Sequence, residues 1–201
     1  MSILIKSDEK NQDVKDQILQ AAKKLFAQQG FSGTSVRQIC EEANVSLALV
    51  SYHFDGKDNV FYSIFEPLNQ FFTEMKFDLT DSRESLHQFI RLFVLYRYEE
   101  HELITILQQE LMMKSPRLDR LTPVIMPSWD DLRSILEACK EQGIIDYPSI
   151  DFAVNFIMGT LIFSMPNSFV NQYDRMLQEN SPDHVAELAI SFITQGLNMK
   201  K

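Results

Sequence analysis

Apolar residues recur every three or four positions along nearly the whole chain, and this period is the strongest constraint on its fold. The first such segment runs from about Asp13 to Gln29. Its apolar stripe consists of Val14, Ile18, Ala21, Ala22, Leu25 and Phe26. Gly30 predicts the end of this helix, because glycine readily takes the left-handed conformation at a helix C-terminus. The pattern predicts an all-α fold of about nine helices.

Composition agrees with a helical protein. Only six glycines and seven prolines occur in 201 residues, whereas an all-β chain needs many turns. The later predicted helices are Lys57 to about Phe77 with a cap at Asp55 and a kink at Pro67, a helix opening at Asp81-x-x-Glu84, His101–Met113, Trp129–Gln142 after a connector containing Pro116 and Pro123, Ser149–Val170, and Pro182–Lys200.

Neither the cysteines nor the termini indicate a special environment. Cys40 and Cys139 lie far apart with no CxxC or Cys/His cluster, so buried apolar roles are favoured over a redox pair or a metal site. No metal or cofactor is expected. The polar segment Met1–Gln12 does not resemble a signal peptide, so a cytoplasmic location is expected.

One long uncharged stretch, Phe152–Tyr173, could be read as a membrane span. It is long enough to cross a bilayer, which takes about 20 residues. However, it contains several asparagines and serines, which a lipid environment disfavours. A helix buried in protein explains the stretch better.

The net charge of −9 argues by itself against nucleic-acid binding. The charge is unevenly distributed, since residues 1–60 hold seven basic and eight acidic residues, and the remainder carries a net charge of −8. A nucleic-acid-binding role for the N-terminal part would therefore require a few well-placed cations.

The segment Gly30–Lys57 has the pattern of two short helices joined by a tight turn. Ser35-x-x-Gln38 fits a capping box at the start of the first helix. Asn44 suits the turn because asparagine tolerates the left-handed conformation, and Ser46 can cap the second helix. These features predict a helix-turn-helix, in which the second helix enters the major groove of DNA.

The blocks Ile18-Leu-x-Ala-Ala-x-x-Leu-Phe, Gly30-Phe31, Thr34-Ser35-Val36-x-x-Ile39-Cys40, Ala43-Asn44-Val45-Ser46 and Tyr52-His53-Phe54-x-x-Lys57 resemble the TetR family of bacterial repressors. The resemblance covers about Asp13–Phe65. It implies a DNA-binding domain over residues 1–56 and a helical ligand-binding and dimerisation domain over residues 57–201. It also implies contacts with double-stranded operator DNA from Thr34, Ser35, Arg37, Ser46, Leu47, Ala48, Ser51, Tyr52, His53 and Lys57.

Several of these residues also have a structural interpretation. Thr34, Ser35 and Ser46 are helix caps in any case, and His53 could be a packed side chain. As functional groups, the hydroxyls at a helix N-terminus could hold a phosphate. Leu47 and Ala48 could touch thymine methyl groups.

The family resemblance further implies a small-molecule pocket in the larger domain. The candidate lining residues are Phe65, Phe72, Phe89, Phe93, Tyr96, Leu103, Met112 and Trp129. An aromatic stripe of this kind is also ordinary helical core. Gln108, Gln109 and Glu110 are either polar anchors for a ligand or a solvated face, and the solvated face is favoured.

The last two predicted helices are more apolar than one monomer core requires. They are expected to form a four-helix interface in a homodimer, through Phe156, Gly159, Thr160, Phe163, Leu188, Phe192 and Ile193. The sequence thus indicates a dimeric repressor released from DNA by an apolar or amphipathic effector. An activator or a ligand-independent regulator remains open. An all-helical enzyme is disfavoured, because the four histidines are scattered and no catalytic motif occurs.

Overall fold

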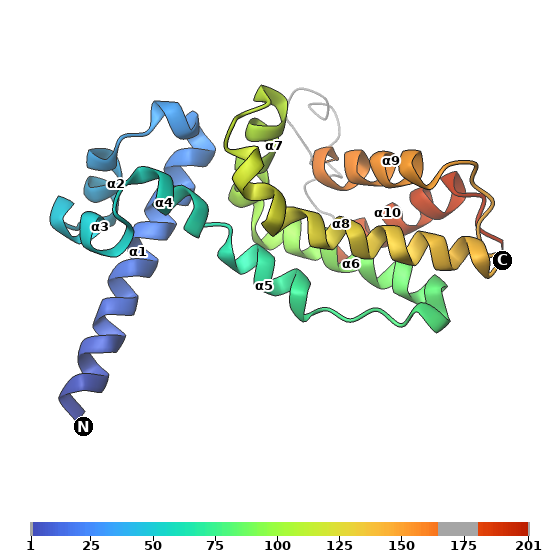
Figure 1. Cartoon of the computed structure of the whole chain (residues 1–201), viewed down its shortest axis with the longest axis horizontal. Coiled ribbons are helices and arrows are strands. Elements are labelled where there is room, and N and C mark those ends of the chain that lie inside the picture. Colours follow the sequence, from blue (N-terminus) through green and yellow to red (C-terminus); the bar gives the residue numbers. More distant parts are fainter. Residues whose placement is uncertain (1, 165–180, 201) are drawn as a thin grey trace. The chain divides into compact units, whose positions relative to one another are not determined.

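The computed structural model describes residues 2–164 and 181–200, and every regular element in these ranges is helical. In chain order (Figure 1) the elements are α1 (Ser2–Gly33), α2 (Val36–Ala43), α3 (Leu47–Phe54), α4 (Lys57–Ser63), α5 (Glu66–Glu74), the 3-10 helix η1 (Leu79–Asp81), α6 (Ser82–Glu99), α7 (His101–Met113), α8 (Leu118–Glu141), α9 (Ile150–Phe163) and α10 (Pro182–Gly196). The all-α prediction is confirmed. The end of the predicted helix Ser149–Val170 lies outside the described residues.

Internal contacts divide the chain into two compact units. The first comprises residues 1–71 and 102–124, and the second comprises residues 72–101 and 125–201. The sequence predicts a domain boundary after residue 56, where the helix-turn-helix ends. The contacts group α4, α7 and the beginning of α8 with that segment.

The first unit is organised around α1, which packs against α2 and α4, while α2 packs against α3. Its core contains the predicted apolar stripe, including Ile18, Ala22 and Phe26, which are buried. Gly30 interrupts α1 with a φ of 72°, as the sequence predicts. The helix begins at Ser2, well before the predicted start (Figure 1), because the polar N-terminal segment continues the helix without an apolar stripe to reveal it.

Two predictions around α4 are wrong in detail. Asp55 does not cap α4. It takes the left-handed conformation at the end of α3, with a φ of 55°, and Gly56 precedes α4. Instead of a kink at Pro67, the helix breaks between Ser63 and Glu66. Proline lacks an N–H and its ring clashes with the carbonyl four residues earlier, which here belongs to Ser63.

Helix α8 begins at Leu118, so the predicted proline-rich connector before Trp129 is wrong. The helix contains Pro123 and Pro127. Each proline removes a backbone donor. On the same turns, the hydroxyls of Thr122 and Ser128 donate to the carbonyls of Leu118 and Ile125, at 2.9 and 2.8 Å. The boundary between the two compact units falls between residues 124 and 125, within this proline-containing segment.

The second unit is built on α6, which contacts both α9 and α10, and α9 also contacts α10. Its core includes Leu86, Ile90, Leu132, Leu136 and Leu161. The predicted cap at Asp81 is confirmed, since its carboxylate accepts the N–H of Glu84 at 3.3 Å. Ser181 caps α10 in the same way. Within the described ranges, no helix combines the length and apolarity needed to cross a bilayer.

Candidate nucleic-acid interface

The junction between α2 and α3 is fixed at both sides of its turn. The capping box is confirmed: the hydroxyl of Ser35 accepts the N–H of Gln38 at 3.3 Å, and Oε1 of Gln38 accepts the N–H of Ser35 at 2.8 Å. Asn44 is left-handed, and the following N–H, from Val45, donates to the carbonyl of Cys40 at 3.0 Å. These contacts define the direction in which α3 leaves the turn.

Helix α3 buries apolar side chains on one side and exposes a mixture of polar and apolar groups. Val50 and Phe54 are buried, whereas Leu47 and Tyr52 are 60% and 75% exposed. Ser46 occupies the N-cap position, but its hydroxyl makes no capping hydrogen bond. The outward face therefore offers hydroxyls, a phenol and aliphatic groups, the mixture that can read base edges and contact phosphates.

Seven of the ten predicted DNA-contacting side chains are exposed on α2, α3 or their caps: Ser35, Arg37, Ser46, Leu47, Ala48, Ser51 and Tyr52. The three others differ. Thr34 is buried and Lys57 is half-buried. His53 is also half-buried, its ring 5.1 Å from that of Tyr52, and its Nε2 has no hydrogen-bond partner.

Thr34 and Lys57 are turned toward the protein. The hydroxyl of Thr34 donates to the carbonyl of Gly30 at 2.9 Å. Nζ of Lys57 donates to the carbonyls of Phe31 and Thr34, at 2.9 and 2.8 Å, and burial lowers the pKa of this ammonium. Both groups thus stabilise the chain between α1 and α2. The geometry does not offer them to a phosphate, contrary to the roles expected from the sequence.

Phe31 links several parts of the first unit, a role that the sequence pattern did not indicate. Two cations lie close to its ring: Nζ of Lys57 is 4.0 Å from the ring centroid and Cζ of Arg117 is 4.1 Å away. The rings of Phe26 and Phe61 are 5.7 and 5.2 Å from it. Within the first unit, Phe31 therefore joins the end of α1 to the start of α4 and to the segment preceding α8.

A buried ion pair supports this arrangement. Nε and Nη2 of Arg117 donate to the two carboxylate oxygens of Glu110, at 2.9 and 3.0 Å, and Glu110 is 3% exposed. Nε2 of Gln109 donates to the carbonyl of Ala27 at 2.8 Å. The favoured reading of Gln109 and Glu110 as a solvated face is wrong, because their polar groups bind other parts of the first unit.

The predicted effector residues fall in both units. Phe72, Phe89, Phe93, Tyr96 and Trp129 form one buried set, here called the aromatic cluster. The ring of Phe93 lies 5.3 Å from Trp129 and 5.8 Å from Phe72, and Tyr96 is 5.9 Å from Phe72. Phe65 and Leu103 are buried in the first unit, and Met112 is exposed there at the end of α7.

The aromatic cluster also contains polar atoms. Burial raises the pKa of the Tyr96 phenol, with the nearby carboxylates of Glu100 and Glu99 adding to the shift, so the group stays neutral. Trp129 is buried, and its indole N–H has no hydrogen-bond partner in the part of the chain that the structure describes. An unpaired donor in an apolar interior is unfavourable, so the indole is a candidate contact for a bound acceptor.

The outward faces of α9 and α10 carry large apolar side chains. Phe156 is 63% exposed and Phe192 is 69% exposed, and Phe152, Phe163 and Leu188 are exposed as well. Phe156, Thr160, Phe192 and Ile193 line a shallow hollow between the two helices. Of the predicted interface residues, Ile193 is buried within the unit, Thr160 is half-buried and Gly159 is exposed. Such a patch is typical of a protein interface.

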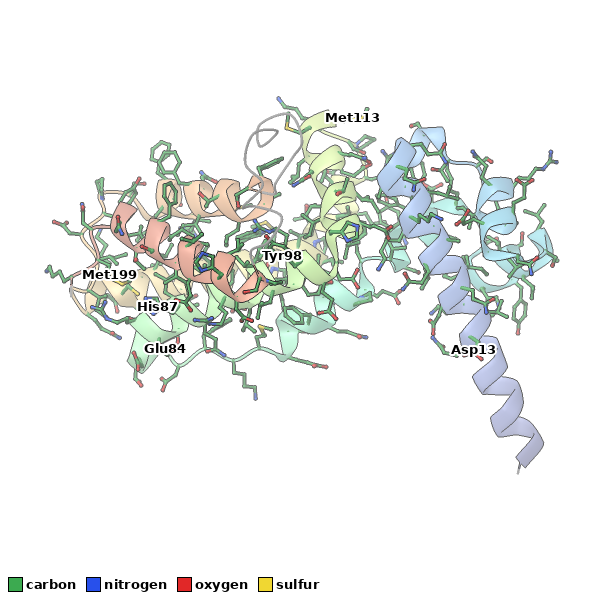
Figure 2. All side chains as sticks on the ribbon, turned by 180° about the vertical axis from the view of Figure 1, so that it is seen from behind. Asp13, Glu84, His87, Tyr98, Met113 and Met199 are labelled. Carbon is green, nitrogen blue, oxygen red and sulfur yellow. The ribbon has the colours of Figure 1, made fainter. Side chains whose placement is uncertain are left out.

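The described residues give little support to catalysis. His87 lies near Glu84 one turn away on α6 (Figure 2), with 4.0 Å between Nδ1 and the carboxylate. The two residues form a surface pair on one helix. Cys40 and Cys139 are free thiols, both buried as predicted, and burial raises the pKa of each.

Comparison with known proteins identifies the class to which this arrangement belongs. Residues 18–64 match the family described as "Bacterial regulatory proteins, tetR family". The chain is 28% identical over 137 residues to the HTH-type transcriptional repressor NicS of Pseudomonas putida, and 36% identical over 61 residues to the HTH-type transcriptional regulator AcrR of Shigella flexneri. These matches cover 65% of NicS and 28% of AcrR, so the chain spans less than two thirds of either relative.

Solved structures cover almost the whole chain. HlyIIR, a hemolysin II transcriptional regulator, is 27% identical with a TM-score of 0.73, covering 94% of this chain and 99% of its own. A putative fatty acid metabolism regulator from Clostridium perfringens shares the fold, with 22% identity and a TM-score of 0.72 over 92% of this chain and all of its own. The chain shares the fold of these regulators, and its residues 18–64 match the TetR family.

Proposed function

We propose that the protein is a transcriptional repressor that binds a near-palindromic operator as a homodimer and is released by a small effector. The outward face of α3 carries this proposal. Its exposed Leu47 and Tyr52 have no role in the core, and the turn at Asn44 holds the helix in a defined direction. The relatives named as transcriptional repressors and regulators support the same activity.

The proposed DNA contacts come from the exposed residues. Leu47 and Ala48 meet base edges in the major groove, where thymine methyl groups accept apolar contacts. Arg37 and Tyr52 contact phosphates, with the hydroxyls of Ser35, Ser46 and Ser51 as further donors. Thr34 and Lys57 act indirectly, by holding the end of α1 against the start of α2.

A homodimer suits this task because two recognition helices can enter successive major grooves, about 34–36 Å apart. The exposed apolar faces of α9 and α10 are the proposed contact surface. In a two-fold interface the same patch meets its own copy, so Phe156 and Phe192 of each protomer become buried together.

The proposed effector is apolar or amphipathic and binds at the aromatic cluster. Binding there favours a conformation in which the two DNA-reading helices are wrongly spaced. A coupling free energy of about 1–3 kcal/mol would weaken operator binding roughly 5- to 150-fold. A cytoplasmic location follows from the proposed role.

The test is a titration of the protein with the DNA directly upstream of its own gene, across a series of salt concentrations. Arg37→Ala and Tyr52→Ala are expected to weaken binding, and loss of a phosphate contact at Arg37 should reduce the salt dependence by about one ion. Lys140→Ala in the second unit is the matched control and should bind like the wild type. Binding that neither Arg37→Ala nor Tyr52→Ala weakens would contradict the proposed interface.

An activator or a ligand-independent regulator would use the same DNA-binding face. A reporter gene placed behind the operator separates these alternatives, since a repressor lowers expression and an activator raises it. No observation in the described residues favours an enzyme.

A further inference from the structure

Arg97 on α6 is a cation buried inside the second unit. It is 1% exposed, and its Nη1 donates to the carbonyl of Leu161 and to the hydroxyl of Ser164, both at 2.7 Å. Among residues 2–164 and 181–200, its Nε has no hydrogen-bond partner. Among the described residues, no ion pair includes Arg97. Burial lowers the pKa of the guanidinium, but arginine remains charged in proteins.

A buried charge without a counter-ion is unfavourable, and proteins normally pair it. The end of α9 compensates part of this charge, because a helix C-terminus carries partial negative charge and the carbonyl of Leu161 belongs to its last turn. A carboxylate would do so more completely. It matches the planar fork of guanidinium N–H groups with two oxygen acceptors.

The surroundings of Arg97 specify the rest of such a ligand. Phe93 lies one helical turn before Arg97 on α6, so the two side chains share one side of the helix. The ring of Phe93 is 5.3 Å from that of Trp129, whose buried indole N–H is a second unpaired donor. The aromatic cluster and the neighbouring Arg97 thus combine an apolar interior with two donors that lack an acceptor among the described residues.

We propose that the effector is an amphipathic monocarboxylate, whose carboxylate pairs with Arg97 and whose hydrocarbon body lies among the rings of the aromatic cluster. This inference rests on the proposed effector response and specifies the chemistry of its ligand. Pairing with Arg97 would also connect the ligand to the proposed dimer surface. Arg97 holds the end of α9, and α9 carries Phe156 and Phe163.

The chain offers a direct probe, because Trp129 is its only tryptophan. Its fluorescence in the full-length protein would be followed during titration with two matched pairs of compounds. Decanoate is paired with 1-decanol, and 4-phenylbutyrate with 4-phenyl-1-butanol. Within each pair the hydrocarbon body is the same and only the acid carries charge. The variants are Arg97→Met, Arg97→Lys and the control Arg91→Met, whose arginine lies on the same helix but is bound to Glu187.

The wild type and Arg91→Met are expected to bind at least one acid about tenfold or more tightly than its alcohol. Arg97→Met should lose this preference and bind acid and alcohol alike. If Arg97→Met does not fold, as judged by circular dichroism, Arg97→Lys tests the same point. It keeps the charge but not the fork, so its acid preference should shrink.

The proposal is overturned if acids and alcohols bind the wild type equally, if an Arg97 variant keeps the full acid preference, or if neither acid changes the fluorescence of Trp129. DNA binding by the ligand-free wild type is measured in parallel. Failure to bind DNA would contradict the proposed function, whereas the acid preference at Arg97 is read from fluorescence alone. The two failures are therefore distinguishable.

Discussion

Replacing Arg117 with methionine should destabilise the first unit strongly. Arg117 forms two hydrogen bonds with the buried carboxylate of Glu110, and its guanidinium lies 4.1 Å from the ring centroid of Phe31. Methionine fills a similar volume but offers no donor. The substitution therefore leaves the charge of Glu110 buried and unpaired.

The magnitude follows from the burial of the pair. Removing one partner of a fully buried ion pair costs about 3–5 kcal/mol. The side chain of Arg117 is 18% exposed, so water can partly replace it and the lower end of that range applies. Loss of the cation beside Phe31 adds roughly 0.5–1 kcal/mol. A total of about 3–4 kcal/mol corresponds to a fall in Tm of roughly 10 °C for a chain of this size.

Differential scanning calorimetry at one fixed protein concentration measures this change, since dimerisation makes Tm depend on concentration. The double variant Arg117→Met with Glu110→Met removes both charges, and should recover much of the lost stability because an apolar replacement of a buried pair is often close to neutral. If Arg117→Met alone melts within about 2 °C of the wild type, then the charge of Glu110 is not left buried and unpaired, because such a charge would lower the free energy of unfolding by more than this.

Three further predictions concern separate parts of the molecule. Ser35→Ala removes the capping box of α2 and should lower the free energy of unfolding by about 1 kcal/mol in urea denaturation, whereas Ser35→Asp, which keeps a capping oxygen, should change it little. Burial and the neighbouring Asp130 raise the pKa of Asp131, so the folded state holds this proton more tightly than the unfolded chain does. The stability of the wild type therefore falls as the pH rises from the unfolded pKa of 3.8 through the raised pKa of the folded state. Asp131→Asn should consequently be more stable than the wild type at pH 7, with the difference vanishing near pH 3, and an equal difference at both values would exclude this cause. Phe192→Asp places a charge on the exposed face of α10 and should convert the proposed dimer to a monomer in sedimentation velocity at micromolar concentration, while Asp183→Asn at the start of the same helix should leave it dimeric.

Three of the local signals predicted helix ends correctly, whereas Asp55 did not cap α4 and the hydroxyl of Ser46 makes no capping hydrogen bond. Ser35, Asn44 and Asp81 act through their own side chains or backbone preferences, and each stands where the pattern places it. Proline was less informative. Pro67 breaks a helix completely, whereas Pro123 and Pro127 lie within one, and the difference depends on surrounding contacts that a periodic pattern does not contain.

The candidate site was predictable only where exposure follows from helix position. The outward residues of α3 alternate with the buried Val50 and Phe54 at helical spacing, so their exposure could be inferred. Lys57 could not be interpreted in this way, because its partners are backbone carbonyls at Phe31 and Thr34, more than twenty residues away.

Arg97 was missed for a related reason. It continues the apolar side of α6 formed by Ile90, Phe93 and Val94, so its position in the pattern indicates a buried charge. Its partners are Leu161 on α9 and Ser164 at the C-cap of that helix, more than sixty residues away. The sequence indicated which helices are amphipathic, but which polar groups meet between them depends on packing.

Whether two copies of α3 read DNA is measured by selecting bound fragments from a genomic DNA library with the purified full-length protein. We expect enriched fragments that share two inverted half-sites with centres about 10 base pairs apart, or a multiple of that spacing, and we expect Tyr52→Ala to abolish the enrichment. Enrichment of no sequence, or of single half-sites without a partner, would contradict the dimeric DNA-reading function.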